Sequence, residues 1–282
     1  MSHQLDTLAS QIRKDAIWSI YHAKSGHPGG VLSCVDILTV LFHDVLAPVE
    51  KRLGSYSDDF FILSKGHAAP ALYAVAASKG LCERAQLKGL RKIDSSFQGH
   101  PDVTHLPWVE VSTGSLGQGI SVATGIAKSQ KLLNSAQHVF ALLGDGEMQE
   151  GQVWEAAMFA AHHKLNNLTA IVDYNKLQSD ARNDDICALE PLADKWRAFG
   201  WQVVEVDGHD IDALQQHLHA SKHNETQSPM VIIAHTIKGK GVDFMEDIPL
   251  WHGSVTLTDK QYKDAMLALG CSAQEIKEYE NV

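Results

Sequence analysis

Two residues suited to binding a cation, Asp145 and Asn175, each follow an apolar run in this sequence. The first run covers residues 138–143 and leads into Gly-Asp-Gly, and the second covers residues 168–172. A carboxylate and an amide offer the hard oxygen ligands that Mg²⁺ prefers, and they leave coordination positions for phosphate oxygens and water. The glycines on either side of Asp145 let the backbone approach a phosphate closely. The pattern predicts a magnesium and diphosphate site.

Two parallel strands joined by a helix would bring these side chains together. The runs 138–143 and 168–172 have the length and apolar character of buried strands, and the segment between them is helical in pattern. The carboxyl ends of parallel strands meet at one edge of a sheet, where α/β proteins bind ligands. Gly-Asp-Gly alone is a common turn, so the second strand and its asparagine are what favour a binding site.

Further strands and helices alternate along the chain. Strands are expected over residues 59–63, 201–206 and 230–234, and helices over 6–24, 33–45, 68–80, a segment ending near 131, a segment after 189, and 211–221. This alternation predicts an α/β fold with a doubly wound, mostly parallel sheet flanked by helices. Residues 1–282 are expected to form a single domain with an N-terminal helical embellishment. Residues 237–253 are expected to form a flexible loop able to close over a ligand.

Several histidines stand beside glycine at the ends of the expected elements: His27, His67, His100, His209 and His252. Loops at the carboxyl edge of such a sheet converge on one crevice. Neutral imidazole can accept a proton from a sugar hydroxyl, and imidazolium can donate one to a forming alkoxide near pH 7. One such histidine is usually a cap or faces solvent, but several at successive loop ends favour acid–base chemistry.

Two glycine-containing segments differ from nucleotide-binding motifs. Residues 114–119 place their glycines as G-x-x-G-x-G, whereas a dinucleotide fingerprint requires G-x-G-x-x-G. Residues 239–241 read Gly-Lys-Gly without the preceding glycine of a P-loop. Lys238 and Lys240 either neutralise a phosphate or are simply solvated.

The Gly-Asp-Gly motif followed by Asn175 resembles the thiamine diphosphate motif, and the flanking residues resemble those of transketolases. The resemblance runs from about residue 6 to about residue 255. It implies the thiamine diphosphate-binding fold, bound thiamine diphosphate, and Mg²⁺, for which Ca²⁺ or Mn²⁺ can substitute. It also implies transfer of a two-carbon ketol unit from a ketose phosphate to an aldose phosphate.

The same resemblance implies roles for individual residues. The catalytic residues would be His27, His100 and His252. The cofactor-binding residues would be His67, Gly114, Ser115, Leu116, Gly146, Glu150, Asn175 and His252. The metal ligands would be Asp145, Asn175 and the backbone carbonyl of Leu177. Glu150, more than Glu155, would join an acidic network at a subunit boundary, although exposed helical glutamates are common. His209 is expected to be structural.

Composition narrows the class of partner. The chain has 282 residues, 44% of them hydrophobic, which is enough for a substantial core. Its formal charge of −10 and lack of a basic cluster argue against nucleic acid as a partner. Because no apolar run approaches about 18 residues and the N-terminus lacks the pattern of a signal peptide, we expect a cytoplasmic protein without a membrane span.

The resemblance implies that this chain holds one half of an active site. In transketolases a downstream pyrimidine domain supplies a glutamate that assists the cofactor, and that domain is expected to be absent here. A separate C-terminal transketolase subunit would provide it, as an α2β2 assembly. One alternative is the α subunit of a 2-oxoacid-decarboxylating thiamine enzyme, which would not need sugar-binding histidines. Another is a noncatalytic cofactor-binding module. The sugar, an ordinary pentose phosphate or a more specialised one, stays open.

Overall fold

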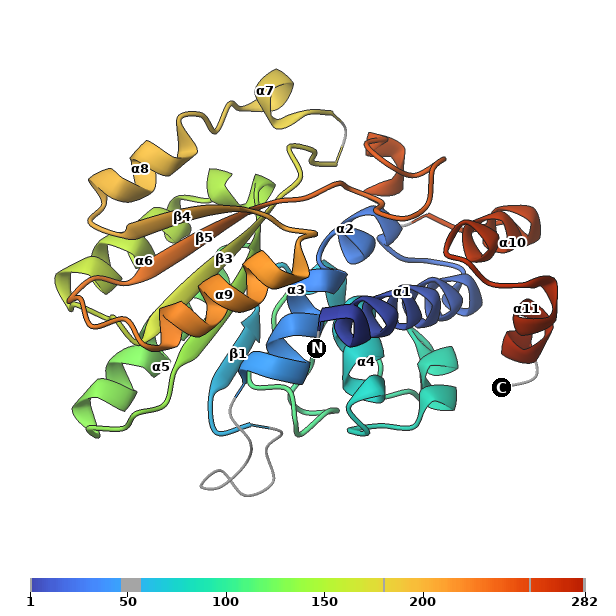
Figure 1. Cartoon of the computed structure of the whole chain (residues 1–282), viewed down its shortest axis with the longest axis horizontal. Helices are drawn as coiled ribbons and strands as arrows, with labels where there is room; N and C mark the ends of the chain where they lie inside the picture. Colours follow the sequence, from blue (N-terminus) through green and yellow to red (C-terminus); the bar gives the residue numbers. More distant parts are fainter. Residues whose placement is uncertain (1, 47–56, 180, 254, 281–282) are drawn as a thin grey trace.

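A parallel β-sheet forms the centre of the computed structural model, which describes residues 2–46, 57–179, 181–253 and 255–280 (Figure 1). The strands are β1 (Phe60–Leu63), β2 (Val139–Gly144), β3 (Leu168–Tyr174), β4 (Gln202–Asp207) and β5 (Met230–His235). Their order across the sheet is β1-β2-β3-β5-β4, and each pair of neighbours is parallel. The predicted α/β fold and the five expected strands are confirmed.

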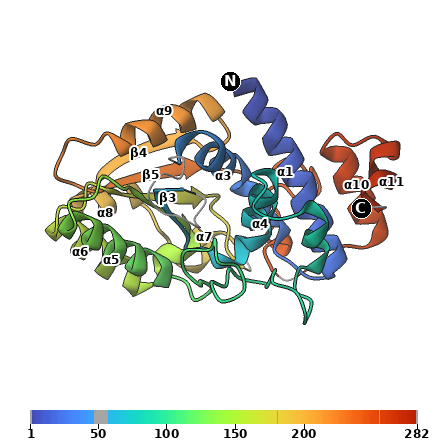
Figure 2. The same cartoon turned by 90° about the horizontal axis from the view of Figure 1, so that it is seen from below.

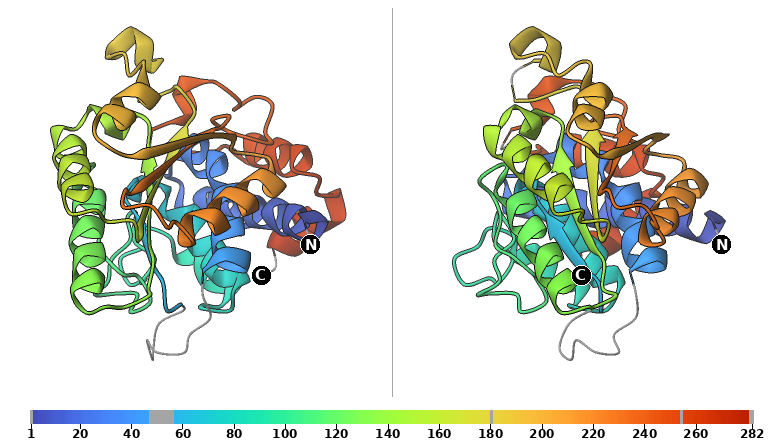
Figure 3. Two further views of the ribbon diagram at one scale, coloured as in Figure 1. Left: turned by 60° about the vertical axis from the view of Figure 1, so that its left-hand side comes forward. Right: turned by 90° about the vertical axis from the view of Figure 1, so that its left-hand side faces the viewer.

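Helices cover both faces of this sheet (Figures 2 and 3). One face carries α5 (Gln118–Leu132), α6 (Gly151–His162) and α8 (Leu192–Ala198), and the other carries α1 (Ser2–Ala23), α3 (Val35–Val40), α4 (Ala69–Ser78) and α9 (Ile211–Lys222). Successive side chains of a strand point to opposite faces. In β2, Ala141 therefore packs in one core and Leu142 in the other. Burial on both faces explains why the strands read as uninterrupted apolar runs.

Shorter elements complete the described part of the chain. They are α2 (Pro28–Ser33), α7 (Asn183–Ile186), α10 (Asp259–Ala268), α11 (Ala273–Glu280), the π-helical turn η1 (Leu41–Val45), and the 3₁₀ turns η2 (Gly66–Ala68), η3 (Arg84–Gly89), η4 (Gly146–Gln149) and η5 (Pro249–Trp251). Within the described ranges, no helix combines the length and the apolar character needed to cross a bilayer.

The chain changes faces at two places along the carboxyl edge of the sheet. The segment after β1 continues into α4 on one face, whereas the segment after β2 continues into α6 on the other. Likewise, α8 follows β3 on one face, and the segment after β5 packs its Val242 and Met245 on the opposite face. Diverging connections of this kind open a crevice between neighbouring strands. The fold thus provides two crevices, at β1/β2 and at β3/β5.

One expectation for an irregular segment is wrong. The glycines after Pro28 are helical, because Pro28 begins α2 and proline suits the first position of a helix. The segment 237–253, expected to be a flexible loop, is instead packed against the core. Its Val242 and Met245 are fully buried, and Trp251 is nearly so. The glycines and lysines at the start of this segment are typical of a flexible loop, but the apolar side chains that follow them are buried and hold the segment in place.

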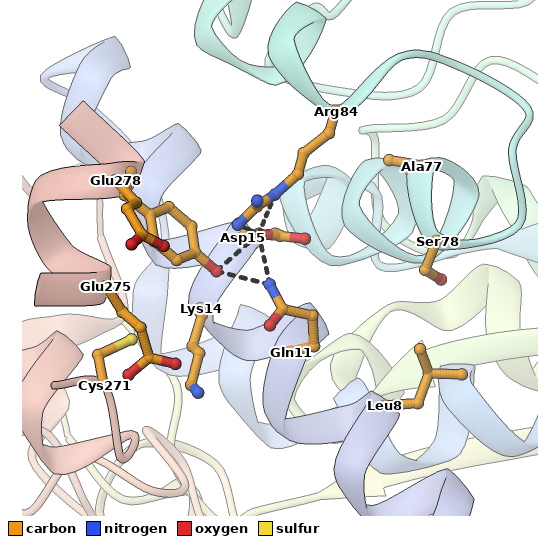
Figure 4. Close-up of a pocket in the computed structure, with 11 residues that line it drawn as sticks. Leu8, Gln11, Lys14, Asp15, Ala77, Ser78, Arg84, Cys271, Glu275 and Glu278 are labelled. Atoms are coloured by element: carbon orange, nitrogen blue, oxygen red, sulfur yellow. Dashed lines mark hydrogen bonds and ion pairs between the residues drawn. The ribbon is translucent and has the colours of Figure 1, made fainter. Parts of the chain in front are cut away.

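The C-terminal helix α11, which was not expected from the sequence, is held against α1 by a buried polar cluster (Figure 4). Its Tyr279 hydroxyl donates to Asp15 at 2.9 Å, and its ring stacks 4.2 Å from the Arg84 guanidinium. Arg84 Nε also donates to Asp15 at 2.8 Å. The Trp18 indole N–H donates to the Tyr279 carbonyl at 3.0 Å. These contacts border a cavity of about 440 Å³ between α1, α4 and α11.

Close contact between α5 and the end of β1 makes one glycine irreplaceable. A Cβ on Gly119 would lie 2.6 Å from the Ser64 Cα, whereas a Cβ on Gly125 of the same helix would meet no atom within 4 Å. We expect Gly119→Ala to lower the free energy of unfolding by about 1–3 kcal/mol through overpacking. Gly125→Ala is the matched control and should stabilise the chain by up to about 1 kcal/mol. Urea denaturation of both variants checks this, and equal stability would contradict it.

Candidate functional site

A cavity that begins at the β1/β2 crevice extends to the carboxyl end of β3 and holds the predicted metal-binding residues. Asp145 directly follows β2 and Asn175 directly follows β3, and the register pairs Gly144 with Asp173 beside them. Both side chains are buried and line a cavity of about 220 Å³. Leu177, Gly146 and Leu116 line the same cavity. The structure therefore brings the three predicted metal ligands together at one point of the sheet edge.

Oxygen atoms of two of these residues already contact a positive charge. The Lys238 ammonium donates to the Leu177 carbonyl at 2.7 Å and to Asn175 Oδ1 at 3.4 Å. Asp145 accepts hydrogen bonds from the backbone N–H groups of Gly146, at 2.8 Å, and Lys176. The ammonium lies against oxygen atoms that a metal ion could bind instead. Carboxylate, amide and carbonyl oxygens are the hard ligands that Mg²⁺ prefers, so these residues fit that ion chemically. The described residues contain no cluster of three or more His, Cys, Asp or Glu side chains that would suit a metal elsewhere.

Burial perturbs both charges at this point. Loss of solvent raises the pKa of Asp145 to about 6, although the nearby Lys238 opposes the shift. Loss of solvent also lowers the pKa of Lys238 to about 8, although the Asp145 carboxylate opposes that shift. Each group is therefore less stable in its charged form than it would be in water. A bound cation and a bound anion would both be favoured here, because each would compensate a buried charge.

A second lysine, Lys65, lines the same cavity. Its ammonium donates to the Gly30 carbonyl at 2.9 Å and pairs with Asp173, and both members of the ion pair are fully buried. Asp173 also accepts from the hydroxyls of Ser33, at 2.6 Å, and Thr236. Burial disfavours both charges, but the pairing outweighs it, so the pKa of Lys65 is raised and that of Asp173 lowered. Lys65 thus stays positive beside the cavity.

A buried glutamate, Glu147, ties the Gly-Asp-Gly turn to the loop before α5. Its carboxylate accepts from the Ser64 hydroxyl at 2.5 Å, from the Gly117 N–H at 2.9 Å and from the Gly144 N–H at 3.0 Å. Burial raises the pKa of Glu147, and these hydrogen bonds oppose the shift. These hydrogen bonds hold Glu147 and the loop that contains Leu116 in place, and together they form one wall of the cavity.

Three of the predicted histidines converge beside this wall. The ring centroids of His27 and His67 lie 5.4 Å apart, those of His67 and His252 5.4 Å, and those of His27 and His252 6.2 Å. His67 and His252 also line the cavity that holds Asp145. Nδ1 of His252 is buried and has no hydrogen-bond partner among the described residues. An unsatisfied buried nitrogen is costly, so this atom is suited to meeting a polar group of a ligand.

Burial keeps these imidazoles neutral at pH 7. It lowers the pKa of His27 to about 4 and that of His252 to about 3, and it places the pKa of His67 well below the usual value. Arg91 Nη2 lies 3.4 Å from Nδ1 of His27. Because guanidinium can only donate, this nitrogen of His27 is the acceptor and its Nε2 carries the proton. Arg91 was not singled out in the sequence, since no motif contains it.

His100 lies next to this cluster, in a neighbouring cavity of about 380 Å³. The positive charge of a protonated His100 would disfavour protonation of His27, so His100 contributes to the lowered pKa of His27. A Cβ on Gly114 would lie 3.1 Å from the His100 ring, so glycine is required for the two to pack together. The Tyr73 hydroxyl donates to the His100 carbonyl at 3.0 Å and fixes the backbone.

Residues 5–279 match the family model described as the transketolase thiamine diphosphate binding domain. The chain belongs to the transketolase family. It is 36% identical to one subunit of the apulose-4-phosphate transketolase of Phocaeicola vulgatus, over 99% of each chain. It is 39% identical to a 6-deoxy-6-sulfo-D-fructose transketolase subunit of Clostridium sp., over 93% of this chain and 94% of that one. Among solved structures, a transketolase from Campylobacter jejuni superposes with a TM-score of 0.83 at 32% identity, covering 94% of this chain but 42% of that one.

Within this transketolase-family chain, the other predicted residues have different settings. Ser115 is exposed in the loop before α5. Glu150, at the start of α6, is exposed and borders the cavity, and Glu155 is exposed further along the helix. The structural interpretation of His209 is confirmed. Its Nδ1 lies 2.7 Å from Asp36, and its Nε2 accepts from a backbone N–H at 2.9 Å.

The histidine cluster of this transketolase-family chain predicts a loss of stability in acid. The folded-state pKa values of His27 and His252 lie below the usual 6.5, so the unfolded chain binds protons more readily. The free energy of unfolding should therefore fall as the pH drops from 6.5 toward 4, and these groups should not affect it above that window. His252→Asn should reduce proton uptake on unfolding near pH 5 by up to about one proton.

Urea denaturation at several pH values between 4 and 7 measures this uptake. The control is His3→Asn, which removes an exposed histidine of α1 and should keep the wild-type slope. An unchanged slope for His252→Asn would show that the buried imidazole does not titrate as described.

Proposed function

We propose that this chain is the diphosphate-binding subunit of a two-chain, thiamine diphosphate-dependent transketolase. It transfers a two-carbon ketol unit from a ketose phosphate donor to an aldose phosphate acceptor. The observation that carries the proposal is the convergence of three neutral imidazoles, those of His27, His67 and His252, beside the oxygen donors of Asp145 and Asn175. A metal and diphosphate site alone would serve any thiamine enzyme, whereas neutral imidazoles suit a substrate rich in hydroxyl groups.

Residues of this chain would bind both Mg²⁺ and the diphosphate group of the cofactor. Asp145, Asn175 and the carbonyl of Leu177 would bind Mg²⁺, for which Ca²⁺ or Mn²⁺ can substitute. The diphosphate would be surrounded by Lys65, Lys238, His67, Gly146, Glu150 and the loop from Gly114 through Ser115 to Leu116. Thiamine diphosphate, when bound, supplies the carbanion chemistry that cleaves and forms carbon–carbon bonds.

The histidines handle protons at the hydroxyls of the sugar. His27 presents its Nε2–H, because Arg91 lies against the other nitrogen. His252 offers an unsatisfied Nδ1 that can accept a proton or a hydrogen bond. His100, across Gly114, would contact the first hydroxyl of the donor. Neutral imidazoles can take a proton from a hydroxyl and return it later in the cycle, which the reaction needs in both directions.

A second chain would supply the pyrimidine pocket. The two relatives named as transketolase subunits are matched along nearly their whole length, whereas the chain spans 42% of the Campylobacter jejuni transketolase. In this proposal residues 1–282 form one diphosphate-binding domain, and an α2β2 complex in the cytoplasm brings it to a C-terminal transketolase subunit. Apolar side chains on α5 and α6 support such a contact, because Val122 of α5 and Met158 and Phe159 of α6 are exposed.

The substrate of this chain is a ketose bearing an anionic group. The names of the two subunit relatives specify a sugar phosphate and a sulfonated sugar, which supports this class. To test it, the assembled complex is given ketose phosphates and, separately, 2-oxoacids, with thiamine diphosphate and Mg²⁺. Release of an aldose phosphate from the ketose is the expected result. Decarboxylation of a 2-oxoacid without ketol transfer would instead identify a 2-oxoacid enzyme, and neither activity would favour a noncatalytic module.

A further inference from the structure

The second crevice, at the carboxyl ends of β3 and β5, contains a cleft of about 570 Å³. Tyr174 and Asn175 border it from the end of β3, and Thr236 and Ile237 from the end of β5. It arises for the same reason as the cofactor cavity, because the segments after the two strands leave toward opposite faces of the sheet. The transketolase chemistry described above does not use this cleft.

Positive side chains from separate segments line the cleft. Lys176 follows β3, Arg182 precedes α7, and Lys240 belongs to the segment after β5. Among the described residues, none of the three lies within ion-pair distance of a carboxylate. Although the formal charge of the chain is −10, this cleft gathers three cations that have no ion-pair partner among the described residues.

The remaining charged groups of the cleft do not cancel this excess. Asp207 and Asp247 line it, and Asp207 already accepts a hydrogen bond from the His209 N–H at 2.8 Å. The two histidines of the cleft are engaged with acids outside it. His209 contacts Asp36 at 2.7 Å, and His235 contacts Glu205 at 3.0 Å. The lining thus carries three cations against two carboxylates.

One of these cations belongs to the metal-binding loop. Lys176 stands between Asn175 and Leu177, and its backbone N–H donates to Asp145 while its side chain lines the second cleft. Similarly, Lys238 contacts the metal-ligand oxygens, whereas Lys240, two residues later, lines the second cleft. Of these three lysines, Lys238 therefore lines the cofactor cavity, and Lys176 and Lys240 line the second cleft.

We propose that the β3/β5 cleft is a separate anion site for a phosphoryl group, bound by Lys176, Arg182 and Lys240. Guanidinium and ammonium donors from different loops match the several oxygens of a phosphate. The ligand is free phosphate or the phosphoryl group of a small phosphorylated sugar. The proposal does not depend on the transketolase assignment, because it concerns binding to the isolated chain.

Titration of the full chain with inorganic phosphate, followed by calorimetry at fixed ionic strength, tests the site. The double variant Arg182→Gln/Lys240→Gln should weaken phosphate binding at least about tenfold, since each lost contact is a charge-assisted hydrogen bond. Lys260→Gln, on exposed α10, removes the same charge elsewhere and should leave this binding unchanged. Lys238→Gln should weaken only the binding of a phosphate that enters the cofactor cavity. Circular dichroism confirms that each variant is folded.

The second arm of the experiment compares a hexose phosphate with the same hexose lacking its phosphate. Stronger binding of the hexose phosphate than of inorganic phosphate identifies a phosphorylated sugar as the ligand, and equal binding identifies free phosphate. Binding that is lost in Lys238→Gln but kept in Arg182→Gln/Lys240→Gln would place the anion in the cofactor cavity and overturn the proposal. Absence of phosphate binding to the wild-type chain would also overturn it.

Discussion

Replacing Asp145 with alanine should abolish the magnesium-dependent activity of the assembled transketolase complex. Asp145 is the one carboxylate among the three proposed metal ligands, and its two oxygens also fix the backbone N–H groups of Gly146 and Lys176. Its removal takes away the negative charge that a divalent cation needs in a buried setting. We expect ketol transfer to fall at least about 100-fold, as even outer-shell substitutions at metal sites cost 10- to 100-fold.

Two variants serve as controls for this prediction. Asp145→Asn keeps the shape and an oxygen donor but loses the charge, so Mg²⁺ should still support activity, at much higher concentrations. Glu155→Ala removes an exposed carboxylate and should leave the magnesium dependence unchanged. Activity is measured as a function of Mg²⁺ concentration in all three. Wild-type magnesium dependence in Asp145→Ala would refute the metal assignment.

Replacing Lys65 with methionine should have the largest effect on stability. Asp173 would stay buried with only the hydroxyls of Ser33 and Thr236 as side-chain partners. Removing one member of a buried ion pair costs about 3–5 kcal/mol, because the remaining charge is left uncompensated. We expect a loss of this size in the free energy of unfolding, measured by urea denaturation of the isolated chain.

The matched control is Lys260→Met, which breaks an exposed pair with Asp264 on α10 and should not change stability measurably. The double variant Lys65→Met/Asp173→Asn should recover part of the loss, since it removes the stranded charge as well. If Lys65→Met unfolds at the same urea concentration as the wild type, the Lys65–Asp173 ion pair does not contribute to the free energy of unfolding as described.

The strands and the positions of the proposed metal ligands at the sheet edge could be predicted because their signals are local. Each buried strand reads as an apolar run, and Asp145 and Asn175 stand at the ends of two of these runs. Parallel pairing then places them together without any further information. The convergence of His27, His67 and His252 followed from the same rule, since their loops all end at one edge of the sheet.

Other features depend on contacts between distant segments and left no local signal. Lys65 and Asp173 are far apart in sequence, and neither pattern alone indicates a buried ion pair. Glu147 resembles any acidic residue after a turn until Ser64 and Gly117 are placed beside it. The segment 237–253 was expected to be flexible because its glycines and lysines mask the apolar residues that anchor it.

The requirement for a second subunit is tested by comparing this chain alone with the chain assembled with a separate C-terminal transketolase subunit. Both samples receive thiamine diphosphate, Mg²⁺, a ketose phosphate and an aldose phosphate, and ketol transfer is followed by the appearance of the new sugar phosphate. We predict turnover by the complex and none by the isolated chain, because in the proposed function this chain holds only the diphosphate end of the cofactor. Robust turnover by the isolated chain would contradict the claim.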